Sequence, residues 1–230
     1  MIDTTTTSRD GVHPLKSRRG GGASGPKRGW PSTTGGPPTS SRSTRGRGPG
    51  VNATGLINIM QWNAEGVYNK KVALAERLQQ ENIDIACLQE THLKGQQRLN
   101  IRGFQVFKHN REGRTKGGAA ILVKNSILAK DFVVNTNDEA EIQGVEMTIG
   151  SQKLKLYNAY CPQDKELSLE YMEIPDDQCL IVGDFNSHSE AWGYAESDRR
   201  GDEVEDWQVD HRLILLNDAD DPLHSSPEDG

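Results

Sequence analysis

Asp184 and Asn186 are the residues of this sequence whose setting points most directly to chemistry. They follow the apolar run Leu180–Val182 and Gly183, a pattern that predicts a buried strand ending in a turn. Alternate residues of an extended chain point the same way, and ligands of open α/β sheets collect beyond the carboxyl ends of strands. A carboxylate there can orient or deprotonate a water, and an amide can bind a phosphate oxygen. The same residue types also favour an Asx turn that only closes a core strand, so this segment alone leaves both interpretations open.

Asn63, Glu65 and Glu90 form a second candidate set, because all three stand just beyond apolar stretches that predict strands. Amide and carboxylate oxygens without His or Cys neighbours are hard ligands, which suit Mg²⁺ or Mn²⁺ and not zinc. Taken alone, Glu90 is better explained as a solvated strand end. Together with Asn63 and the Asp184 and Asn186 pair at other strand ends, it favours a metal site.

Cleavage of a phosphate ester also needs donors for the phosphate oxygens. Tyr160 closes an alternating strand pattern and could donate its phenol, although a core-edge tyrosine with its hydroxyl in water fits as well. His188 could be a further phosphate donor and is more simply a turn histidine. Lys116, before Gly117, is equally consistent with a phosphate-facing loop and with a solvated basic turn.

The elements that must position these residues follow from apolar spacing. Residues 56–62 predict a strand, residues 68–81 a helix, and residues 83–88 a strand buried on both faces. This is a βαβ unit, whose crossover is right-handed in almost every known case. Its parallel strands end beside each other, which places Asn63 and Glu90 at one end of a sheet.

Several further strands are expected after this unit. Their ranges are 104–108, 119–124, 142–149, 153–160 and 179–182, with helical pieces at 165–172 and 203–209 and a last apolar run at 213–216. Gly150-Ser151 predicts a hairpin between two of these strands. Many strands after one helix indicate an α/β fold with two packed sheets and helices outside.

Composition divides the chain near residue 55. Residues 1–55 hold 12 of the 24 glycines and 6 of the 10 prolines, and their nine Lys and Arg against two Asp give a net charge of +7. We expect them to form a disordered basic tail, which either holds nucleic acid non-specifically or is only a linker or extension. Residues 56–230 carry 18 Lys and Arg against 31 Asp and Glu, a net charge of −13. They are predicted to be one domain, 56–223, followed by a disordered acidic end, 224–230.

The sequence carries no targeting or membrane signal. No apolar signal-peptide core follows Met1, and no apolar run reaches the roughly 18 residues that a membrane span needs. The three cysteines, Cys87, Cys161 and Cys179, are odd in number and lie in apolar contexts, as expected for buried thiols in a reducing compartment. We therefore expect an intracellular protein, nuclear or cytoplasmic, with no membrane partner and no implied oligomer.

Five motifs occur in an order that resembles the endonuclease/exonuclease/phosphatase superfamily. They are MQWNAEG at 60–66, CLQETHL at 87–93, GGAAI at 117–121, YNAYCP at 157–162 and VGDFNSH at 182–188. Within the superfamily the chain is most similar to the endonuclease domain of non-LTR retrotransposon polyproteins, because of the residues that follow the last motif: Trp192-Gly193, Asp198–Gly201 and Leu216–Asp218. The resemblance covers residues 56–223.

The resemblance implies a fold and an activity. The fold is a four-layer α/β sandwich, two packed mixed β-sheets flanked by helices. The activity is a phosphodiesterase that uses Mg²⁺ or Mn²⁺ to nick DNA, leaving a 3′-hydroxyl that primes reverse transcription. DNA and the element's own RNA are the implied partners.

The resemblance also implies roles for individual residues. Glu90 would be the principal metal ligand, with Asn63 as a metal or phosphate contact and Glu65 at the family's acidic position nearby. Asp184 would orient or activate the attacking water or assist the leaving group. The two phosphate contacts would be Tyr160, at the scissile phosphate, and Asn186.

The sequence departs from the family pattern near its end. Family members add a strand with an orienting Asp and finish on a terminal strand with an Asp-His pair, whereas Asp210-His211 comes too early, beside the helix expected at 203–209. We therefore expect a C-terminally truncated domain, with its last strands missing and its activity impaired or absent. The alternatives are a phosphatase of the same superfamily that acts on phosphate esters, and a non-catalytic nucleic-acid-binding remnant.

Overall fold

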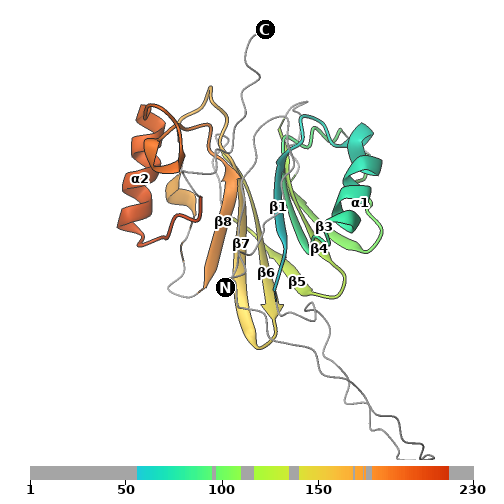
Figure 1. Cartoon of the computed structure of the whole chain (residues 1–230). Helices are drawn as coiled ribbons and strands as arrows, with labels where there is room; N and C mark the ends of the chain where they lie inside the picture. The colour runs from blue at the N-terminus through green and yellow to red at the C-terminus, as the bar shows by residue number, and fades with distance from the viewer. Residues whose placement is uncertain are drawn as a thin grey trace, which may run out of the picture.

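The computed structural model describes residues 56–94, 97–109, 117–134, 140–167, 169–172, 174 and 178–217. The expected tail 1–55 and acidic end 224–230 lie outside these residues, as does Lys116. Two four-stranded sheets face each other, and an α-helix covers the outer side of each sheet (Figure 1). The predicted α/β sandwich of two mixed sheets flanked by helices is confirmed.

The first sheet contains the predicted βαβ unit. Its strands are β1 (Ile59–Asn63), β2 (Ile85–Gln89), β3 (Phe104–His109) and β4 (Ala119–Lys124), in the order β1-β2-β4-β3. β1 and β2 are parallel, and the other pairs are antiparallel. A 3₁₀ turn, η1 (Tyr68–Lys70), leads into α1 (Lys71–Gln80), which buries Leu74 and Leu78 against the sheet. Helical spacing of apolar residues therefore predicted this crossover correctly.

The second sheet contains β5 (Leu128–Phe132), β6 (Glu141–Ile149), β7 (Gln152–Tyr160) and β8 (Cys179–Asp184), in that order. β6 and β7 form the predicted hairpin, and β7 pairs with β8 in parallel. The helix outside this sheet is α2 (Arg199–Asp210), and two 3₁₀ turns precede it, η2 (Leu169–Tyr171) and η3 (Glu190–Trp192). Parallel pairing makes β7 and β8 end at the same edge of the sheet.

The structure differs from the expected elements in several places. β5 was not expected, because it is an edge strand whose sequence, LAKDF, mixes charged and apolar residues without alternation. The helix expected at 165–172 is only the single turn η2, and α2 begins before residue 203 because Asp198 caps it. The apolar run at 213–216 forms neither helix nor strand, and Ile214 is 83% exposed.

The apolar core lies between the sheets and under each helix. Between the sheets, Cys87 and Ile121 of the first sheet pack with Val145 and Leu156 of the second. Separate clusters fill the space under α1 and under α2. Among the described residues, no helix combines the length and apolar composition that crossing a bilayer requires.

Three buried amide side chains interrupt this core and join the sheets beneath one edge. Asn158 of β7 donates to the carbonyl oxygens of Leu88 (2.9 Å) and Ala120 (3.0 Å) in the opposite sheet. Gln89 Nε2 donates to Asn158 Oδ1 (2.5 Å), and Gln61 Nε2 donates to the carbonyl of Gly183 (2.9 Å). Buried polar groups of this kind are stable only when they are paired. Their hydrogen bonds therefore fix the position of one sheet relative to the other.

Candidate active site

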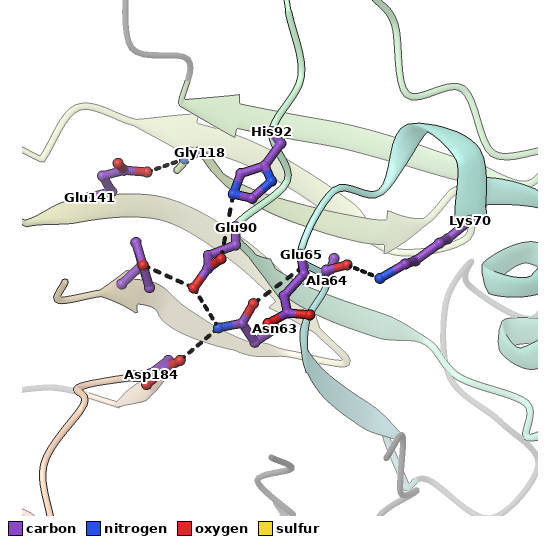
Figure 2. A network of polar contacts seen from close by, with 10 residues as sticks. Asn63, Ala64, Glu65, Lys70, Glu90, His92, Gly118, Glu141 and Asp184 are labelled. Atoms are coloured by element: carbon purple, nitrogen blue, oxygen red, sulfur yellow. Dashed lines mark hydrogen bonds and ion pairs between the residues drawn. The ribbon is translucent and has the colours of Figure 1, made fainter. Parts of the chain in front are cut away.

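The candidate site lies where four strands end together, two from each sheet. β1 and β2 are in parallel register with Asn63 opposite Gln89, and β7 and β8 with Tyr160 opposite Asp184. Glu90 follows β2 directly. The amide network below this edge holds the sheets against each other, so polar side chains from both sheets meet at one place (Figure 2).

Asn63 is the centre of the network. Its side-chain nitrogen, Nδ2, donates to Glu90 Oε1 (3.0 Å) in its own sheet and to Asp184 Oδ2 (2.8 Å) in the other. The amide is 3% exposed. Hydrogen bonds from a buried amide to ionised carboxylates are stronger than neutral ones, so Asn63 holds two acidic side chains at a fixed separation.

Tyr160 also contacts Glu90. Its hydroxyl donates to Glu90 Oε1 (2.9 Å), the same oxygen that accepts from Asn63. Burial raises the pKa of Tyr160, and the negative charges of Glu90, Asp184 and Glu141 raise it further. The phenol therefore stays protonated over the whole neutral range and keeps its O–H available as a hydrogen-bond donor.

The backbone is strained at this same edge. Glu65 (φ 41°), Glu90 (φ 48°) and Asn186 (φ 46°) all adopt the left-handed conformation just after a strand. This costs roughly 1–2 kcal/mol for an L-residue, although Asn tolerates it better than Glu. Such strain concentrates at functional sites, where the surrounding structure holds it in place.

Asn186 and His188, which follow β8, lie at different distances from the network. The Asn186 backbone N–H donates to Asp184 Oδ1 (3.1 Å), and its side chain donates to the carbonyl of Cys161 (3.1 Å). His188 instead faces Asp198, with 3.3 Å between Nδ1 and Oδ2, and its ring lies 4.3 Å from that of Tyr194. Asn186 thus ties the loops after β7 and β8 together, whereas His188 belongs to the contact with α2.

The Glu65 side chain lies outside the side-chain contacts of this network. Glu65 is exposed, and its backbone N–H donates to Asn63 Oδ1 (3.4 Å). Its carboxylate takes no part in the hydrogen bonds drawn in Figure 2. Lys116 falls outside the described residues. The structure therefore brings together Asn63, Glu90, Tyr160 and Asp184, with Asn186 beside them.

Two residues next to the site were not expected from the sequence. His92 Nε2 lies 3.4 Å from Glu90 Oε2, the oxygen that faces away from Asn63. Glu141, 1% exposed, accepts a hydrogen bond from the N–H of Gly118 and is the cross-strand partner of Tyr160. The only sequence signal for His92 was its position two residues after Glu90. Glu141 was missed because it stands just before residue 142, where its strand was expected to begin.

The donor set fits one class of metal ion. The described residues contain no group of three His, Cys, Asp or Glu side chains arranged to hold a metal. They do bring the carboxylates of Glu90 and Asp184 to the same amide nitrogen. Proteins hold Mg²⁺ through one or two carboxylates, with water and substrate phosphate supplying the remaining oxygens, so the site suits such an ion and not zinc.

Comparisons with known proteins relate the chain to polymerases of mobile elements. A probable RNA-directed DNA polymerase from transposon X-element of Drosophila melanogaster is 28% identical over 151 residues, which are 63% of this chain and 17% of that protein. The RNA-directed DNA polymerase from mobile element jockey of Drosophila funebris is 23% identical over 175 residues, 74% of this chain and 19% of that protein. The chain therefore spans less than a fifth of these relatives' length.

A solved structure and a family profile complete the comparison. The endonuclease domain of TRAS1, a telomere-specific non-LTR retrotransposon, superposes with a TM-score of 0.60 at 25% sequence identity, covering 70% of this chain and 75% of that one. The profile of the endonuclease/exonuclease/phosphatase family matches residues 60–222, a range that includes Asn63, Glu90, Tyr160 and Asp184. With well over half of its length matched, the chain belongs to the endonuclease/exonuclease/phosphatase family.

Proposed function

We propose that this chain is a divalent-metal-dependent phosphodiesterase domain that nicks DNA for a retrotransposon and leaves a 3′-hydroxyl that primes reverse transcription. The observation that carries the proposal is the Asn63 amide, which joins Glu90 and Asp184 while Tyr160 donates to Glu90. The printed names of the relatives, an endonuclease domain of a retrotransposon and polymerases of mobile elements, support the choice of DNA as substrate. The element's own RNA is a proposed second partner.

Glu90 is the proposed principal metal ligand, and Asn63 and Glu65 carry further oxygens at the same strand ends. A divalent ion held by these residues would supply positive charge that offsets the phosphate and makes a bound water more acidic. The chain's own residues would then place the reactants. They would contribute orientation and proton transfer.

Asp184 is held on both of its oxygens, Oδ1 by the N–H of Asn186 (3.1 Å) and Oδ2 by Asn63 (2.8 Å). A carboxylate fixed in this way can orient an attacking water or accept its proton. Tyr160, protonated because its pKa is raised, would turn its O–H toward a phosphate oxygen. Asn186 would add an amide contact to the phosphate after giving up its bond to Cys161.

We expect this chain to nick DNA slowly. The resemblance implies a histidine partner for Asp184. Among the described residues, no histidine forms a hydrogen bond or ion pair with Asp184. His211 lies at the exposed end of α2, where its ring contacts Trp207. Since losing one member of a catalytic unit costs orders of magnitude in rate, slow nicking stays our prediction.

The proposal is tested by nicking of supercoiled plasmid in Mg²⁺. We expect Glu90→Gln and Asp184→Asn each to lower the rate about 100-fold or more, the usual contribution of a positioned acid, base or charge. Glu76→Gln, on the exposed face of α1, is the control and should leave the rate unchanged. Nicking that survives Glu90→Gln would refute the proposal.

A second measurement covers the case in which the wild-type chain does not nick. Binding of Mn²⁺, followed by its electron paramagnetic resonance signal, should be weakened by Glu90→Gln and not by Glu76→Gln. Mn²⁺ binding that depends on Glu90, without nicking, indicates an impaired enzyme. If neither nicking nor Glu90-dependent Mn²⁺ binding is observed, the proposed site is excluded.

A further inference from the structure

We infer that Arg200 is a positioning residue that holds the loops after β7 and β8 in a fixed relation, an inference whose catalytic part rests on the proposed function. Its guanidinium donates to four backbone carbonyls. They belong to Asn186 (3.0 Å), Phe185 (2.7 Å), Cys161 (3.1 Å) and Lys165 (2.6 Å). Two of these follow Asp184 closely, and the other two follow Tyr160.

The loops that Arg200 joins carry the reactive groups from the second sheet. Cys161 is bonded directly to Tyr160, and its N–H donates to the carbonyl of Asp184 (2.8 Å). The carbonyl of Cys161 accepts from both Arg200 and the Asn186 side chain. A shift of either loop would therefore move Tyr160 relative to Asp184, and hence relative to Glu90.

An arginine is needed for this arrangement, and a lysine would not replace it. The guanidinium has five N–H groups in a rigid plane, whereas an ammonium has three on a flexible stem. Arg200 is half-buried, and no described acidic side chain forms an ion pair with it. Its charge is instead solvated by the carbonyl dipoles, which would lose their partners if the side chain were shortened.

The first turn of α2 delivers Arg200 to this place. Asp198 caps the helix by accepting from the N–H of Gly201 (2.7 Å), and the N–H of Asp198 donates to the carbonyl of His188 (2.9 Å). Gly201 is required for this contact, because a Cβ there would lie 1.8 Å from the His188 oxygen. The first turn of α2 thus packs closely against the loop after β8.

The position of Arg200 also conflicts with the helix dipole. The first turn of a helix disfavours cations by roughly 0.3–1 kcal/mol, yet Arg199 and Arg200 both stand there. Arg199 is 79% exposed and pairs with Glu203 (3.1 Å) on the helix surface. Only the second arginine faces the loops, which makes Arg199 a matched control of identical chemistry at the neighbouring position.

The test compares Arg200→Lys and Arg200→Ala with Arg199→Lys and Arg199→Ala. In plasmid nicking, we expect the Arg200 variants to lower kcat about 10- to 100-fold, since misplacement by about 1 Å costs up to about 100-fold. KM should stay nearly constant, because the Arg200 guanidinium contacts the chain's own carbonyls and is not proposed to bind the substrate. Ethylguanidinium added to Arg200→Ala should restore part of kcat, and the Arg199 variants should match the wild type. Equal kcat in both pairs, or a loss confined to KM, would overturn the inference.

Hydrogen exchange of residues 161–165 and 184–188 supplies a readout that does not depend on activity. Both segments should exchange faster in Arg200→Lys than in Arg199→Lys. Equal exchange in the two variants would refute the positioning role of Arg200, even if nicking were never seen. If the wild type does not nick and Mn²⁺ does not bind, the proposed function fails while exchange still decides the role of Arg200. If Arg200→Ala does not fold, the lysine pair carries the test.

Discussion

Replacing Asn158 with alanine should weaken the attachment of one sheet to the other. The side chain is fully buried, donates to the carbonyls of Leu88 and Ala120, and accepts from Gln89. The alanine variant leaves two acceptors and one donor without their partner in the core. Each unsatisfied buried group costs about 1–3 kcal/mol, and water entering the space left by the amide offsets part of that.

We therefore expect a loss of about 3–5 kcal/mol in the free energy of unfolding, a large share of the roughly 5–15 kcal/mol that holds a domain together. Urea denaturation, followed by tryptophan fluorescence, measures this loss. Asn125→Ala, in an exposed turn, is the control and should change the free energy by no more than about 0.5 kcal/mol. A loss below about 1 kcal/mol for Asn158→Ala at an unchanged urea slope would refute the reasoning, because the amide would then not be needed to join the sheets.

The remaining predictions concern the helix docking, the acidic strand end and pH. Gly201→Ala should lower the melting temperature by several degrees, because its Cβ meets the His188 carbonyl, whereas Ala195→Gly in the exposed loop should not. Glu65→Gln should lower the rate of plasmid nicking less than Glu90→Gln does, because the Glu65 side chain is exposed and is proposed only as an accessory oxygen donor; a loss as large as that of Glu90→Gln would contradict this ranking. Burial raises the pKa of Cys161 from 9.0 to about 12, so stability should be full below pH 9 and fall as pH rises toward 12. Urea midpoints between pH 7 and 11 measure this fall, which should be shallower in Cys161→Ala; a flat profile in the wild type would contradict it.

Local patterns predicted most of the fold. Helical spacing gave α1, and unbroken apolar runs gave β2 and β4, because elements buried on a whole face must be apolar along it. β5 was missed because an edge strand is held by pairing with β6 and leaves Lys130 and Asp131 in solvent. The helix expected at 165–172 was wrong in length for a similar reason: apolar spacing alone does not determine whether a turn continues.

The candidate site could be predicted as a set of residue types but not as a set of contacts. Asn63, Glu90, Tyr160 and Asp184 stand at strand ends, and strand ends follow from where apolar runs stop. His92 and Glu141 gave too little local signal, since a single histidine or a residue at the start of a strand has many ordinary explanations. Glu65 also stands just after a strand end, but apolar runs do not determine that its side chain is exposed.

The sequence by itself determined which elements form and which polar side chains stand at their ends, because hydrophobic runs and turn residues act over a few positions. Only the tertiary structure decided that the nitrogen of Asn63 lies between carboxylates from two different sheets. That contact joins residues 121 positions apart and depends on how the sheets pack over Gln61, Gln89 and Asn158. The same holds for Arg200, which local rules would place on a solvated helix turn and which long-range packing directs to four carbonyls beside the site.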